Sequence, residues 1–103
     1  MPEFLALTEA TYYILLALYQ PMHGYGIMNR VEELSHGRVV LGAGTLYGAI
    51  SSLQDKGWIK LLPVEEGSRK KDYQLTEKGK QVLRNELNRL KELVSNGDQV
   101  LGG

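Results

Sequence analysis

The order in which helical and strand-like patterns follow one another is the feature that most restricts the fold of this chain. Apolar residues recur at three- and four-residue steps up to about residue 57, and again from about residue 77 to residue 95. Two short apolar runs with a turn sequence between them separate these two parts. The pattern predicts three helices, a β-hairpin and a last helix, which is a mainly α fold with a small β-hairpin (α+β).

Capping and turn residues set the expected boundaries of these elements. The N-caps and stops that fit best are, in chain order, Thr8, Pro21, Gly37, Gly57, Thr76 and Gly97. The strands are expected over residues 58–64 and 71–75, and residues 24–26 are expected to form a turn before the second helix. Residues 39–41 should form either a very short strand or an extended connector.

Three helices followed by a two-stranded hairpin make up the winged helix-turn-helix, in which the third helix enters the major groove of DNA. A chain of 103 residues is long enough for a single modest core. We therefore expect one compact domain overall. Within it, residues 1–76 would form the winged helix-turn-helix and residues 77–103 a C-terminal dimerisation helix and tail.

Two of the expected helices carry more apolar surface than one small chain can bury. The first is apolar on nearly all sides, which requires cover on more than one side. In the last helix, expected to end near residue 95, apolar residues follow the spacing of a coiled-coil seam. We expect a homodimer that joins these helices through Tyr12, Leu16, Leu83, Leu87, Leu90 and Val94.

Composition excludes several classes of function. Without cysteine, and with two histidines that have no paired carboxylates at metal spacing, the chain offers no expected metal or cofactor site. No nucleophile stands with a base and an orienting group, so we do not expect an enzyme. Neither a secretion signal nor an apolar stretch of membrane-spanning length is visible, which predicts a cytoplasmic protein with no membrane partner.

Five short motifs resemble the PadR-like transcriptional regulators. They are residues 12–18 (YYILLAL), 23–26 (HGYG), 44–47 (GTLY), 57–59 (GWI) and 73–79 (YQLTEKG), in the order of the family. The chain is similar to the short subfamily with a single C-terminal helix, whose members dimerise through the first and last helices. The resemblance implies a sequence-specific repressor that binds a double-stranded DNA operator and is released by a small aromatic or drug-like effector.

Two groups of residues are candidates for DNA contact. On the third helix, with its apolar stripe turned inward, the outer positions are Thr45, Tyr47, Gly48, Ser51 and Ser52. Tyr47 could equally seal the junction between the second and third helices with its ring. At the hairpin tip stand Arg69, Lys70 and Lys71, which are suited to phosphates if the hairpin lies beside a groove.

Other features point elsewhere. The net charge is zero, and Gly48, Asp72 and Gln74 depart from residues common in the family, which weakens the expected grip on phosphate. A winged-helix protein–protein interaction module without DNA binding is therefore the alternative. The aromatic residues of the first helix and its lead-in suggest core and dimer packing, or else a ligand pocket at the dimer centre formed by Phe4, Tyr12 and Tyr13.

Overall fold

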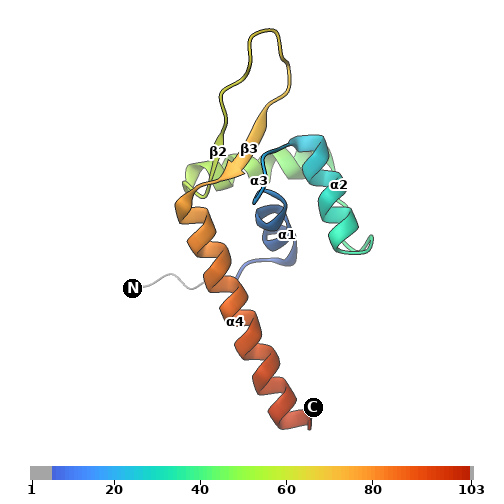
Figure 1. The fold of residues 1–103 in the computed structure, drawn as a ribbon. Helices are drawn as coiled ribbons and strands as arrows, with labels where there is room; N and C mark the ends of the chain where they lie inside the picture. The colour runs from blue at the N-terminus through green and yellow to red at the C-terminus, as the bar shows by residue number, and fades with distance from the viewer. Residues whose placement is uncertain (1–5, 103) are drawn as a thin grey trace.

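The computed structural model describes residues 6–102 and has the predicted mainly α fold with a small antiparallel sheet (Figure 1). The hairpin extends from one end of the molecule and the last helix extends toward the other. The elements are α1 (Glu9–Ala17), β1 (Met22–His23), α2 (Gly24–Leu34), α3 (Ala43–Asp55), β2 (Ile59–Leu61), β3 (Asp72–Leu75) and α4 (Glu77–Leu101).

The core is built around α1, which lies between α2 and α4 (Figure 1). The Thr8 hydroxyl accepts a hydrogen bond from the Thr11 N–H at 3.1 Å and caps the helix, as predicted. Ile14, Leu15 and Leu18 are almost completely buried. Because this helix is apolar on several sides, it can contact α2 and α4 at once, and it connects these two helices through the core.

The sheet has three strands in the order β1-β3-β2, one strand more than predicted. Residues 22 and 23 pair antiparallel with β3 through Met22↔Tyr73 and His23↔Asp72. Two residues are too few for an alternating pattern, so sequence periodicity gave no sign of β1. The helix α2 also begins earlier than expected, at Gly24, without a separate turn.

The hairpin strands are shorter than predicted. β2 stops at Leu61, and beyond it the Leu62 N–H donates to the Asp72 carbonyl at 2.9 Å. Val64 is exposed because the core ends below this level, so its apolar side chain does not prolong the strand. Residues 39–41 form an extended connector, the second of the two expected possibilities.

The last helix is longer than predicted. Thr76 caps it as expected, accepting from the Gly79 N–H at 3.0 Å. The expected stop at Gly97 is wrong, since the helix continues to Leu101 and ends where Gly102 adopts a left-handed conformation (φ 82°). A glycine inside a helix costs only about 1 kcal/mol relative to alanine, which the surrounding helix formers can offset. In the described residues 6–102, no helix is both long and apolar enough to cross a membrane.

A close backbone contact holds the start of α4 against the sheet. A Cβ atom placed on Gly79 would lie 2.0 Å from the Trp58 carbonyl oxygen and 2.9 Å from its carbon. Both of these are backbone atoms, which cannot move aside as a side chain could. Only glycine therefore lets α4 approach the residue before β2 this closely.

Gly79→Ala should consequently destabilise the protein, although alanine is the better helix former. Overpacking of this kind costs about 1–3 kcal/mol, and each 1 kcal/mol lowers the Tm of a domain of this size by about 4–8 °C. Gly48→Ala is the matched control, because Gly48 also lies within a helix but a Cβ there meets nothing within 4 Å. Thermal unfolding should show a lower Tm for the first variant only; equal effects would contradict the contact.

Candidate nucleic-acid interface

The outer face of α3 is small, polar and exposed. Leu46, Ile50 and Leu53 are buried as predicted and anchor the helix on the core. The predicted DNA-contact residues of this helix are all exposed: Thr45, Tyr47, Gly48, Ser51 and Ser52. Thr45, Gly48 and Ser52 recur at three- and four-residue steps and so share one side of the helix. Another backbone could approach this side closely, since no large side chain covers it.

Tyr47 joins α3 to the start of α2. A Cβ atom on Gly24 would lie 2.3 Å from the Tyr47 hydroxyl oxygen, so the ring lies directly against this glycine. Half of the Tyr47 surface is nevertheless exposed (50%). The packing role predicted for the ring is therefore present. Its exposed surface leaves a phosphate contact open, and this remains a prediction.

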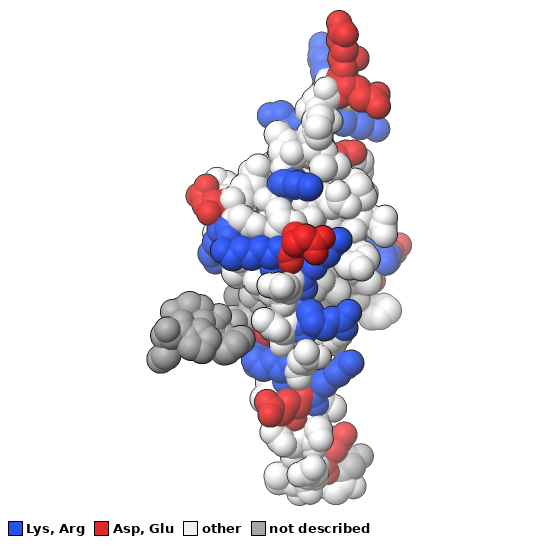
Figure 2. All heavy atoms as spheres, turned by 60° about the vertical axis from the view of Figure 1, so that its left-hand side comes forward, with Lys and Arg blue, Asp and Glu red and all other residues white. Residues whose placement is uncertain are grey.

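The basic cluster lies on the returning arm of the hairpin. Arg69, Lys70 and Lys71 are exposed, and Gly67 (φ 84°) forms the turn before them, where the Ser68 N–H donates to the Glu65 carbonyl at 2.9 Å. Figure 2 shows acidic side chains beside basic ones at this end of the molecule.

The acidic neighbours on the opposite arm are Glu65 and Glu66, both exposed. The positive potential of the tip is therefore partly cancelled by charges within the same loop. Sequence reasoning missed this neutralisation, although the two glutamates stand within a few residues of the basic cluster and could have revealed it.

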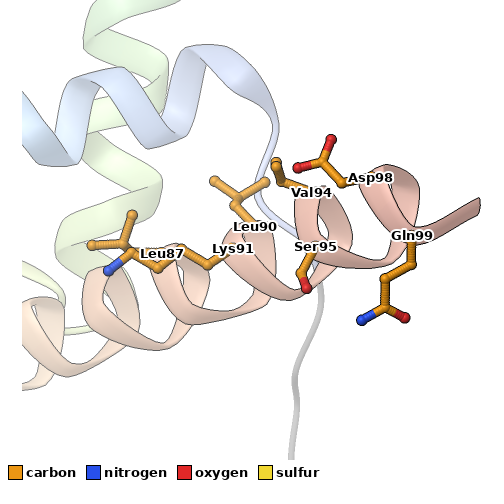
Figure 3. A pocket seen from close by; sticks show the side chains of 7 residues that line it. All are labelled: Leu87, Leu90, Lys91, Val94, Ser95, Asp98 and Gln99. Carbon is orange, nitrogen blue, oxygen red and sulfur yellow. The ribbon is translucent and has the colours of Figure 1, made fainter. Parts of the chain in front are cut away.

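The predicted dimerisation residues fall into two groups. Leu83 is buried in the core of its own chain (8% exposed) and presents almost no surface to a second chain, because the first turns of α4 pack on α1 and the sheet. Farther along, Leu87, Leu90 and Val94 border an open hollow of about 530 Å³ on α4 (Figure 3). On α1, the predicted residues Tyr12 and Leu16 are half-buried.

The apolar surface of α4 extends beyond the predicted seam. Leu93, Val100 and Leu101 are exposed by 50%, 84% and 86%. Sequence reasoning missed the last two because it ended the helix at Gly97. With the helix continued, these residues and the seam form one broad apolar face on its last turns.

A buried carboxylate lies where α4 leaves the rest of the fold, and the sequence analysis did not identify it. Glu86 is 5% exposed and accepts hydrogen bonds from Arg89 at 2.7 Å on each oxygen and from the Leu7 N–H at 3.1 Å. The Arg89 guanidinium is the main cause of the lowered pKa of Glu86, with the Leu7 N–H adding to it. Burial, the Glu86 charge and Tyr13 together raise the pKa of Tyr12.

Two of the three predicted ligand residues lie within the described part of the chain. Phe4 lies outside the described residues. Tyr12 and Tyr13 are half-buried, with ring centroids 6.2 Å apart and planes tilted by 56°. Neither of them borders the hollow on α4. The ligand pocket therefore remains a prediction.

Comparison with known proteins identifies the family. Residues 13–85 match the model of the transcriptional regulator PadR-like family, which is most of the chain. The chain belongs to the PadR-like family. The members of this family are transcriptional regulators, and the match runs from the second half of α1 to the first turns of α4.

Solved structures of PadR-like proteins have the same fold. A PadR family regulator from Clostridium difficile R20291 is 26% identical with a TM-score of 0.78, and the match covers 91% of this chain and 99% of that one. Bacillus subtilis PadR in complex with operator DNA is 30% identical with a TM-score of 0.63; the match covers 75% of this chain and 45% of that one.

A curated relative is much longer than this chain. The match is to an uncharacterised 37.1 kDa protein of transposon TN4556 from Streptomyces fradiae, 36% identical over 86 residues. It covers 82% of this chain but only 24% of the relative, so the chain spans about a quarter of that protein.

Proposed function

We propose that this PadR-like chain is a sequence-specific repressor that binds a pseudo-palindromic double-stranded DNA operator as a homodimer. The observation that carries the proposal is the exposed outer face of α3, held outward by its buried stripe and flanked by the hairpin. The operator complex of Bacillus subtilis PadR, 30% identical to this chain, supports a DNA partner. Each α3 would enter a major groove, and each hairpin would act as the wing that holds the flanking backbone.

The residues of α3 would have different roles in the groove. Thr45 lies in the first turn, where its hydroxyl and free backbone N–H groups suit a phosphate. Gly48 has no side chain, and a Cβ there would meet no atom of the protein within 4 Å. The duplex could therefore approach the helix backbone closely at this position. Ser51 and Ser52 can donate to or accept from base edges, and Tyr47 can reach a phosphate with its hydroxyl.

The wing would contribute affinity without sequence information. Arg69, Lys70 and Lys71 are exposed and can neutralise backbone phosphates, which releases counterions. Glu65 and Glu66 on the facing arm repel the same phosphates and weaken this contribution. Binding should therefore depend on salt less steeply than for a purely basic wing.

Replacing Lys70 and Lys71 with alanine tests the wing. Binding to genomic DNA fragments retained by the wild-type protein should weaken alike for all sequences. The slope of log affinity against log salt should become shallower by about 1.8, or about 0.9 for each lost phosphate contact. Ser51→Ala should instead change the preference among fragments with little change in slope.

The matched control removes negative charge from the same loop, in place of the positive charge removed by the lysine variant. Glu65→Gln with Glu66→Gln should strengthen binding, because it removes repulsion of the phosphates. If the lysine variant keeps the wild-type affinity and salt slope, the wing does not contact the backbone and a protein–protein interaction module becomes the better explanation.

A homodimer is the partner that best fits the apolar surface of α4. Leu87 and Leu90, which are half-buried, form one stripe with Val94 and Leu101, which the described part of the chain leaves exposed. A second copy would bring the same stripe, as a two-fold interface requires, and Tyr12 and Leu16 of α1 would border it. In this division, residues 1–76 read DNA and residues 77–103 dimerise.

Charged residues in this stripe should disrupt the dimer. Leu87→Glu with Leu90→Glu would bury unpaired charge in an apolar interface, which is costly. Light scattering of this leucine variant should detect monomers or loss of folded protein. The control variant, Asn88→Glu with Glu92→Lys, changes exposed positions of the same helix and should remain dimeric. A folded dimer of the leucine variant would show that the interface lies elsewhere.

An interaction module without DNA binding is the second candidate. The zero net charge, the uncharged outer face of α3 and the glutamates at the hairpin tip are the observations that favour it. If the wild-type protein retains no genomic fragment at low salt, the interaction module becomes the better explanation.

Relief of repression by a small aromatic or drug-like effector is the last part of the proposal. Tyr12 and Tyr13 offer two neighbouring aromatic rings to a planar compound. Phe4, outside the described residues, is the third residue of the predicted ligand site. The effector would act by favouring a dimer geometry unsuited to the operator, through its differential affinity for the two forms.

A planar aromatic compound that weakens operator binding should lose its effect on Tyr13→Leu. The response should persist in Tyr25→Leu, since Tyr25 is exposed on α2, away from this pair. Titration of operator affinity against compound concentration measures both. An unchanged response in Tyr13→Leu would exclude this pair as the effector site.

A further inference from the structure

The last turns of α4 extend beyond the rest of the fold from a single buried polar contact. Glu86 is the last buried residue of the helix, and from Lys91 to Gly102 every residue is exposed except the half-buried Gly97. Figure 1 shows this end of α4 extending beyond the other helices. At a rise of 1.5 Å per residue, the part of the helix beyond Glu86 is about 22 Å long. A rotation of about 10° at this point would displace its end by about 4 Å.

Glu86 connects α4 with the segment that leads into α1. Its side chain belongs to α4, the N–H that it binds at 3.1 Å belongs to Leu7, and Leu7 directly precedes Thr8, the N-cap of α1. Arg89, one turn farther along α4, occupies both carboxylate oxygens at 2.7 Å. The contact therefore ties the extending helix to the N-terminal end of the central helix of the core.

The chemistry of this contact differs from that of its surroundings. Nearby, α4 packs on the body through Val82 and Leu83, and apolar contacts of this kind are non-directional and tolerate sliding. Hydrogen bonds to a buried carboxylate have preferred directions and are costly to break, because the charge would be left unpaired. Burying a charge adds little net stability, but it can favour one arrangement over similar ones.

We infer that Glu86 is a positioning residue that fixes the direction of α4 relative to the winged-helix body and so sets the spacing between the two α3 helices of the dimer. The consequence for spacing rests on the proposed function. A displacement of about 4 Å exceeds the rise of about 3.4 Å between successive base pairs. Without this contact, the dimer would therefore accept operators whose half-sites are one base pair closer together or farther apart.

Glu86→Met removes the carboxylate and keeps an apolar side chain of similar length. Arg89 is 31% exposed and can turn to solvent. The matched control is Glu92→Met, which makes the same change at an exposed position of the same helix. Should Glu86→Met fail to fold, Glu86→Gln serves instead, because the amide cannot accept on both atoms from Arg89.

The first readout needs neither DNA nor a dimer. The chain has no cysteine, so spin labels can be placed at Gln54→Cys on α3 and Asn96→Cys on α4, both exposed. Pulsed electron spin resonance, with labelled protein diluted into unlabelled protein, gives the distance within one chain. Glu86→Met should shift or broaden this distance by several ångströms and Glu92→Met should leave it unchanged; an unchanged distribution in Glu86→Met overturns the inference.

The second readout is the preference for half-site spacing. Wild type and Glu92→Met should bind the selected operator more tightly than versions with one base pair added or removed, and Glu86→Met should lose this preference while remaining dimeric. A preference retained in full by Glu86→Met overturns the role in spacing. If the wild-type protein binds no DNA, the proposed function fails, whereas the distance measurement still decides whether Glu86 orients α4.

Discussion

The apolar surface on the last turns of α4 exceeds what the described residues 6–102 cover, and the arrangement of the protein depends on this excess. The first turns of the helix pack on α1 and on the sheet, through Leu83 and the close contact at Gly79. The remaining turns extend from the body with Leu93, Val94 and Leu101 exposed. A surface of this kind is stable in water when a second apolar surface covers it, which favours a symmetric dimer.

The same core that supports α4 also presents α3. The helix α1 contacts α2 and α4, and α2 contacts α3, so a continuous series of packed elements leads from α4 to α3. Gly24 allows α2 to approach Tyr47 of α3 closely, and Gly79 allows the start of α4 to approach the Trp58 backbone. In the proposed dimer, the position of α3 relative to the partner copy would therefore be determined by a few rigid contacts and by the direction in which α4 leaves the body.

Sequence reasoning was most successful where periodicity or capping carried the signal. The buried stripe of α3 (Leu46, Ile50 and Leu53) followed from helical spacing, and Thr8 and Thr76 followed from their capping chemistry. It failed at Gly97, because glycine is both a common helix stop and a tolerated interior residue. The strand β1 was too short to show a pattern.

The features of the site that escaped prediction depend on contacts between distant residues or on neighbouring charge. Glutamate is normally exposed, so a buried Glu86 could not be expected, and its partner Leu7 is 79 residues away in the chain. The balancing of the basic wing by Glu65 and Glu66 was visible in the sequence, but its effect depends on the hairpin bringing the two arms together.

The central claim is that two copies of this chain act together on one operator. Native mass spectrometry of the full chain, mixed with a duplex selected from genomic DNA, counts the protein chains in each complex directly. The account predicts two chains per duplex, with no substantial population carrying one. A complex of one chain per duplex, or the absence of any complex at low salt, would contradict it.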